Sequence, residues 1–190
     1  MGDTVMVREY WYVNQKRWLN RFIALFTWAP NPNTEPISHC EIEDIEAGMM
    51  YTSTTRGKAN GTVVRPAAGV LDHPENWYYT EHEVHVADFR IARRYARLRV
   101  DANKGYAFRD LFRFVMPLWM LKKTGMADNG REICSEHVES WLVDMGVLQK
   151  RLLRSPRRLC KATVLATGSP LRRLVDNSIV RDGNWDKQGK

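Results

Sequence analysis

The chain has 190 residues, of which 44% are hydrophobic and 27% charged, and its formal net charge is +7. This length suits one domain with a buried core, and the composition excludes an intrinsically disordered protein. Three cysteines are too few for a disulfide framework, which favours synthesis in a reducing compartment. The basic balance favours anionic partners such as nucleic acid, anionic lipid or cell-wall polymer, although a solvated basic surface is the commoner explanation.

No segment of the sequence indicates a membrane protein. Residues 1–8 lack the basic and apolar regions of a signal peptide, and Met6 stands where a myristoylation motif requires Ser or Thr. The most apolar stretch, residues 114–121, is too short to span a bilayer. We therefore expect synthesis in the cytoplasm and no membrane span.

The first half of the chain predicts β-strands. Asn60-Gly61, a typical hairpin turn, indicates that the strand before it pairs with residues 62–64. Residues 81–86 alternate polar and apolar residues, as a half-buried strand does. The other strand candidates are rich in β-branched and aromatic residues or flanked by turn residues: residues 22–28, 37–42 and 49–55.

From Phe89 onward the sequence predicts helices. Ile91, Tyr95 and Leu98 mark the apolar stripe of a first helix, whose polar side is rich in arginine and which ends near residues 103–105. A second helical pattern covers residues 108–115. The clearest helical segment runs from residue 134 to residue 145 and is followed by a glycine at the C′ position.

These elements predict an α+β fold in which an antiparallel sheet packs against helices. We expect one domain over residues 1–175, with a β-rich part at 20–87 and a helical part at 89–165. The polar, glycine-containing residues 176–190 predict a flexible tail.

Cys134 is the candidate nucleophile, because it opens the clearest predicted helix. Unpaired backbone N–H groups and the helix dipole favour a thiolate at that position. The same groups, among them the N–H of Cys134, can stabilise the oxyanion of a tetrahedral intermediate. Free cysteines are usually small core residues, and Cys40 and Cys160 fit that interpretation better. Cys40 alternates with His39 and should point to the opposite face of its strand.

His39 is the candidate general base, although a purely structural role is the alternative. Glu41 lies two residues along the same strand and shares the face of His39, so it could accept a hydrogen bond from one ring nitrogen. The other nitrogen would then take the thiol proton. Ser53, on the next strand, is the alternative orienting residue, and Tyr51 and Thr55 share its face.

Two further interpretations of these residues are weaker. His137, one helical turn after Cys134, is a rival base that we expect on the flank of the helix. A zinc site built from Cys134, His137 and the pair at 39–40 lacks the ligand spacing of zinc proteins, so we expect neither a metal nor a cofactor. Three other histidines have no thiol assigned to them: His73, His82 and His85.

Residues 38–42 (Ser-His-Cys-Glu-Ile) and 134–138 (Cys-Ser-Glu-His-Val) resemble two motifs of the circularly permuted branch of the NlpC/P60 papain-like superfamily. This branch includes lecithin:retinol acyltransferase-like proteins and YiiX/YaeF-like hydrolases, and its histidine precedes its cysteine, as here. The resemblance spans about residues 22–159, with looser matches at 105–110 and 155–159. Cys40 stands where the branch usually has valine.

The resemblance implies a permuted papain-like architecture and a cysteine hydrolase that acts through a covalent acyl-enzyme. Cys134 would be the nucleophile and His39 the base, oriented by Glu41 or Ser53. The substrate would be a bacterial cell-wall peptide or a lipid-linked amide or ester. The resemblance further implies a phage-encoded protein that is carried in the virion or released on lysis.

The alternative function follows from the charge. A non-catalytic basic binding protein or virion-associated protein on the same fold would hold an anionic polymer without sequence readout. Arginine pairs at 93–94, 157–158 and 172–173 support this alternative. The sequence does not predict an oligomeric state.

Overall fold

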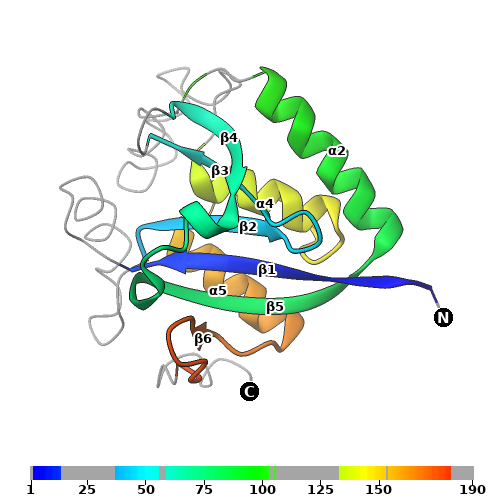
Figure 1. Cartoon of the computed structure of the whole chain (residues 1–190). Helices are drawn as coiled ribbons and strands as arrows, with labels where there is room; N and C mark the ends of the chain where they lie inside the picture. Colours follow the sequence, from blue (N-terminus) through cyan, green and yellow to red (C-terminus); the bar gives the residue numbers. More distant parts are fainter. Residues whose placement is uncertain are drawn as a thin grey trace, which may run out of the picture.

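The computed structural model of the chain describes residues 2–13, 37–55, 59–102, 105, 133–152 and 154–180. These residues form an α+β fold, in which a six-stranded antiparallel sheet has the strand order β4-β3-β2-β1-β5-β6 and three α-helices pack beside it (Figure 1). The predicted fold class is therefore confirmed. The strands are β1 Thr4–Tyr12, β2 His39–Asp44, β3 Met49–Thr54, β4 Gly61–Pro66, β5 Trp77–His85 and β6 Arg172–Arg173. The α-helices are α2 Val86–Ala102, α4 Cys134–Asp144 and α5 Pro156–Thr167, and two short 3-10 turns are η1 Ala67–Gly69 and η2 Pro74–Asn76.

Strand β1 lies in the middle of the sheet, between β2 and β5, and the sequence did not predict it. Its side chains alternate between the two faces, but Tyr10 and Trp11 are both buried because both faces of the sheet are covered here. A strand with two covered faces loses the simple polar–apolar alternation from which strands are predicted.

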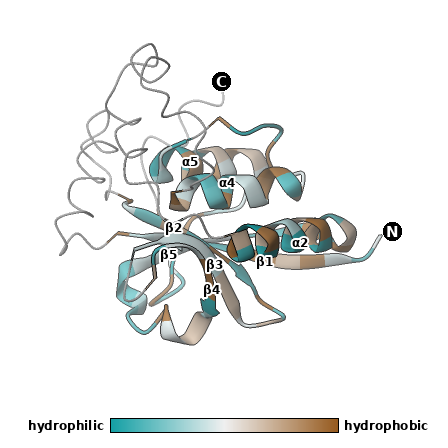
Figure 2. Ribbon diagram, turned by 90° about the horizontal axis from the view of Figure 1, so that it is seen from above, coloured by the Kyte–Doolittle hydropathy of each residue, from teal (hydrophilic) through white to brown (hydrophobic). Residues whose placement is uncertain are grey.

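Helices α4 and α5 lie on one side of the sheet, and α2 packs against α4 (Figure 2). The core between helices and sheet includes Trp11 and Ile42 from the strands and Val138 and Trp141 from α4. The opposite side of the sheet carries a smaller aromatic cluster, which η1 helps to cover; it consists of Tyr10, Met50, Ala67, Val70, Trp77 and Tyr79.

Helix α2 confirms the predicted helix, but the predicted buried stripe was wrong. Ile91, Tyr95 and Leu98 are 49%, 49% and 55% exposed. The buried side is made by Phe89 and two alanines, Ala92 and Ala96. Small residues let α2 approach α4 closely. Two of its arginines make ion pairs instead of forming a solvated face, Arg93 with Asp44 and Arg99 with Asp144.

Most other predicted elements that fall on described residues are present. The strand over 37–42 is β2, the strand over 49–55 is β3, and β3 pairs with β4 as the hairpin prediction requires. The strand predicted at 81–86 is the second half of the longer β5. Helix α4 ends as predicted, with Gly146 in the left-handed conformation at φ 74°. Residues 22–28 and 108–115 lie outside the described residues.

The described residues end in a small turn after β6. The N–H of Val180 donates to the carbonyl of Leu171, and Ile179 forms a bridge with Arg172. The predicted tail boundary at residue 176 lies within this turn, and residues 181–190 lie outside the described part of the chain. Among the helices that are described, none combines the length and the apolar character needed to cross a bilayer.

Candidate active site

The first turn of α4 places Cys134 against the sheet. The Glu136 carboxylate reaches back and accepts a hydrogen bond from the Ile133 N–H, at 3.1 Å. This contact satisfies one of the backbone donors that a helix start leaves unpaired and fixes where α4 begins. Cys134 is 2% exposed and belongs to the core between α4 and the sheet, so its thiol faces the body of the protein, as the sequence predicted.

Strands β2 and β3 separate at the place that Cys134 faces. Their ladder runs from Asp44 opposite Met49 to Ile42 opposite Tyr51, and it continues no further toward the start of β2. The hydroxyl of Thr52 replaces the missing ladder bond, because it donates to the Cys40 carbonyl at 3.0 Å.

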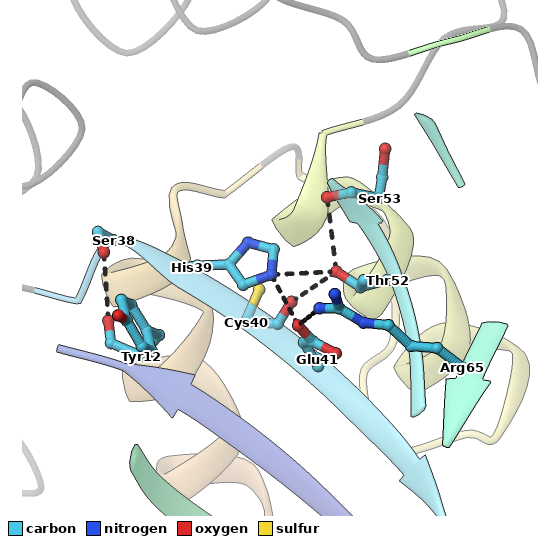
Figure 3. A network of polar contacts seen from close by, with 8 residues as sticks. All are labelled: Tyr12, Ser38, His39, Cys40, Glu41, Thr52, Ser53 and Arg65. Carbon is cyan, nitrogen blue, oxygen red and sulfur yellow. Dashed lines mark hydrogen bonds and ion pairs between the residues drawn. The ribbon is translucent and has the colours of Figure 1, made fainter. Parts of the chain in front are cut away.

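His39 is the first residue of β2 and lies at this opening (Figure 3). The residue is 5% exposed, and its ring packs near Trp77, with 6.5 Å between the ring centroids. His39 Nε2 lies 3.0 Å from Glu41 Oε1 and 3.4 Å from Thr52 Oγ1. The predicted pairing of Glu41 with one ring nitrogen is therefore confirmed.

The partners of His39 Nε2 select the tautomer of the ring. A carboxylate only accepts hydrogen bonds, and the Thr52 hydroxyl hydrogen is directed to the closer Cys40 carbonyl. Both partners therefore favour a hydrogen on Nε2, which makes Nδ1 the acceptor nitrogen of the neutral ring.

Arg65 binds the same carboxylate oxygen of Glu41 that His39 contacts. It reaches across from β4, and its guanidinium donates to Glu41 Oε1 (Figure 3). Glu41 is fully buried, so a positive partner and a histidine N–H together compensate the cost of removing its charge from water. The carboxylate is thereby fixed in the position that orients the imidazole.

The surroundings of Cys134 stabilise its thiolate. A hydrogen bond with the Cys40 side chain is the largest influence that lowers the pKa of the Cys134 thiol well below its usual value, against the opposing effect of burial. The charge of His39, a hydrogen bond with His39 and a hydrogen bond from the Cys40 backbone lower this pKa further. Burial and the neighbouring Cys134 raise the pKa of the Cys40 thiol. Of the two thiols, Cys134 is therefore the one that ionises.

The structure brings Cys134, His39 and Glu41 together, whereas the side chain of Ser53 points away from the imidazole (Figure 3). Thr52 of β3 contacts His39, and its hydroxyl also lies 3.5 Å from the backbone carbonyl oxygen of Ser53. His137, the rival base, is fully buried within α4.

Three contacts of the site were not foreseen from the sequence: those of Thr52, Arg65 and Cys40. Thr52 could have been found by counting from the turn, because a ladder with Ile42 opposite Tyr51 places position 52 on the face of Glu41. Nothing in the sequence indicated that Arg65 would contact Glu41, because this contact depends on the register with which β4 pairs with β3. Cys40 does alternate with His39, but its thiol meets Cys134 and is not only a core filler.

The described residues contain no group of three or more His, Cys, Asp or Glu side chains that could hold a metal ion. Several arginines outside the site have partners within the chain: Arg154 pairs with Glu139, and Arg173 lies over the Tyr78 ring, with 5.5 Å from its guanidinium carbon to the ring centroid. Part of the positive charge of the chain is thus engaged in contacts within the protein.

Comparisons of the chain with models of protein families, with curated proteins and with solved structures find no match. The resemblance to the permuted NlpC/P60 branch therefore remains a prediction that rests on the two motifs.

Proposed function

We propose that this protein is a cysteine hydrolase that cleaves an amide, peptide or ester bond through an acyl-enzyme on Cys134. The observation that carries the proposal is the convergence of three features. A thiol of lowered pKa lies at a helix start, beside an imidazole whose far nitrogen is held by a buried carboxylate. Nucleophile, base and orienting group are the parts that covalent acyl transfer requires.

The first half of the reaction forms the acyl-enzyme. The Cys134 thiolate attacks the carbonyl carbon, and the proton that it has lost resides on His39 Nδ1. The developing oxyanion is stabilised by backbone N–H groups at the start of α4, including that of Cys134. The His39 imidazolium then gives its proton to the departing amine or alcohol.

The second half releases the acid. His39 Nδ1 takes a proton from a water molecule, whose oxygen attacks the acyl carbon, and the thiolate leaves. Throughout, Glu41 accepts from Nε2 and stabilises the imidazolium, while Arg65 and Thr52 hold Glu41 and the ring in place. In this scheme Thr52, and not Ser53, is the polar residue that β3 contributes.

The substrate class follows from the resemblance and not from the site. A bacterial cell-wall peptide or a lipid-linked amide or ester fits the permuted NlpC/P60 branch, and so does a phage-encoded protein that meets its substrate on lysis. The basic binding alternative is less favoured, because Arg93 and Arg173 make contacts within the chain.

Intact-protein mass spectrometry during turnover tests the proposal. With muropeptides or activated acyl esters, the wild-type chain should gain one acyl mass that maps to Cys134 and then lose it. Cys134→Ala should form no adduct, and His39→Ala should form and release it much more slowly. Cys160→Ala is the matched control and should behave as wild type.

Two outcomes would contradict the proposal: an acyl adduct that persists in Cys134→Ala, or a substrate panel that gives no adduct with the wild-type chain. Salt-sensitive binding of polyanions by an inactive chain would favour the alternative.

A further inference from the structure

Cys40 has a contact in the site that acyl transfer does not require. It is fully buried, it lies on the helix-facing side of β2, and it shares a core cluster with Cys134. Hydrogen bonding by the side chain and the backbone of Cys40 lowers the pKa of the Cys134 thiol, which places the two thiols beside one another. A second thiol in direct contact with the nucleophile offers a reaction of its own.

We propose that Cys40 and Cys134 form an oxidation-sensitive pair, which a hydroperoxide converts into a disulfide that reversibly blocks the nucleophile. The geometry supports such a bond, because β2 and α4 are packed neighbours and both cysteines lie in the buried cluster between them. The two sulfurs must approach to the bonding distance of about 2 Å for the disulfide to form. The inference draws on the proposed function only for its consequence, the loss of activity.

The chemistry proceeds in two balanced steps. The Cys134 thiolate attacks one oxygen of the hydroperoxide and the O–O bond breaks, which gives a sulfenic acid on Cys134 and an alcohol or water after the leaving oxygen takes a proton. The Cys40 thiol then loses its proton and attacks the Cys134 sulfur, and the S–O bond breaks to release water. Two thiols thus supply the two electrons that reduce the peroxide.

The two cysteines have different roles in this sequence. Cys134 reacts first, since its environment favours the thiolate, which is the form that peroxides oxidise. Cys40 is held protonated by burial and acts second, as the resolving thiol. Without a resolving thiol, a sulfenic acid proceeds to sulfinic and sulfonic acids, which simple thiol reductants do not reverse. Cys40 would therefore protect the nucleophile.

Peptide mapping after peroxide treatment tests the pair. The full chain is exposed to hydrogen peroxide, its remaining thiols are blocked with N-ethylmaleimide, and it is digested without reductant. We expect a Cys40–Cys134 linked peptide, loss of Cys134 reactivity, and recovery of that reactivity with dithiothreitol. Cys160, on α5, is the third thiol of the same core cluster, and Cys160→Ala should give the same result because the disulfide is assigned to Cys40.

Two variants make the outcome decisive. In Cys40→Ser, which nearly keeps the size of the side chain, and in Cys40→Ala, Cys134 should become irreversibly oxidised and dithiothreitol should not restore it. The proposal is overturned if the wild-type chain also yields Cys134 sulfinic acid without a linked peptide, or if the linkage involves Cys160. A linked peptide in a chain that forms no acyl-enzyme would refute the proposed function and leave this pair standing. An acyl-enzyme in a chain that forms no Cys40–Cys134 linkage would refute the disulfide and leave the proposed function standing.

Discussion

Glu41 is the residue on which the orientation of the imidazole depends. Its buried carboxylate lies between His39 Nε2 and the Arg65 guanidinium, and an amide in its place would neither balance Arg65 nor stabilise an imidazolium. We predict that Glu41→Gln lowers kcat/KM by about a hundredfold or more. Glu43→Gln is the matched control, because Glu43 is the next carboxylate on the same face and accepts from the Tyr10 hydroxyl instead. Equal losses in the two variants would contradict an orienting role for Glu41.

Thr52 and Ser53 are neighbours whose contributions the structure separates. Thr52→Val removes the hydroxyl that bonds to the Cys40 carbonyl and faces His39, so it should cost about 1 kcal/mol of unfolding free energy and slow the alkylation of Cys134. Ser53→Ala should leave that alkylation rate nearly unchanged. The rates follow from peptide mapping with iodoacetamide and the stabilities from urea unfolding. A larger effect on alkylation from Ser53→Ala would return the orienting role to Ser53.

Among the elements, helix α2 has one face that packs against the protein and one that is exposed, and substitutions should distinguish the two. Ala96 is fully buried and Leu98 is 55% exposed. Ala96→Leu should overpack the interface and destabilise the fold by about 1–3 kcal/mol. Leu98→Ala should change the unfolding free energy by less than about 0.5 kcal/mol, as surface substitutions usually do. Denaturant unfolding of both variants measures these free energies. A larger destabilisation by Leu98→Ala than by Ala96→Leu would mean that the predicted stripe of Ile91, Tyr95 and Leu98 is the buried face of α2.

The elements also show how far sequence reasoning reaches. Local signals predicted α4 correctly, because the helical pattern over residues 134–145 and Gly146 directly after it are independent markers of one helix. The pleat of β2 likewise predicted the contact between His39 and Glu41. Those inferences depend only on residues close together in the sequence, within one period of a strand or helix.

What could not be predicted depends on contacts between distant segments. Strand β1 was not predicted because both of its faces are covered. The buried face of α2 was predicted wrongly because two alanines make most of it, together with Phe89. Arg65 joins the site only through the register of β4. The burial of β1, the buried face of α2 and the position of Arg65 all depend on segments that are distant in the sequence, and these contacts cannot be identified from a single sequence.

At the scale of the whole molecule, a buried pair outside the active site makes stability depend on pH. His82 Nε2 lies 3.6 Å from Glu9 Oε1 beneath the helices. Burial lowers the pKa of His82 from 6.5 to about 4, so the native state keeps this ring neutral while the unfolded chain protonates it. The contribution of His82 to stability is therefore fully present above pH 6.5 and is lost as the pH falls toward 4, by up to about 3 kcal/mol.

Urea unfolding across this pH range checks the prediction. His82→Gln should flatten the decline between pH 6.5 and 4, whereas His85→Gln, at an exposed position on the same strand, should keep the wild-type slope. Burial also raises the pKa of Glu9, which acts in the opposite sense: its contribution is lost as the pH rises above its ordinary value. A wild-type slope in His82→Gln would show that His82 is not the responsible group.

The pH profile of Cys134 alkylation tests the pairing of Cys134 with His39 most directly. Iodoacetamide labelling is followed by peptide mapping from acidic to alkaline pH, in the wild-type chain and in His39→Ala. We predict that Cys134 reacts before Cys40 and Cys160 at neutral pH, with a midpoint below about 8.5, the value for a free cysteine. In His39→Ala the midpoint should rise and the rate at neutral pH should fall. Equal reactivity of the three thiols, or a profile that His39→Ala leaves unchanged, would contradict the pairing.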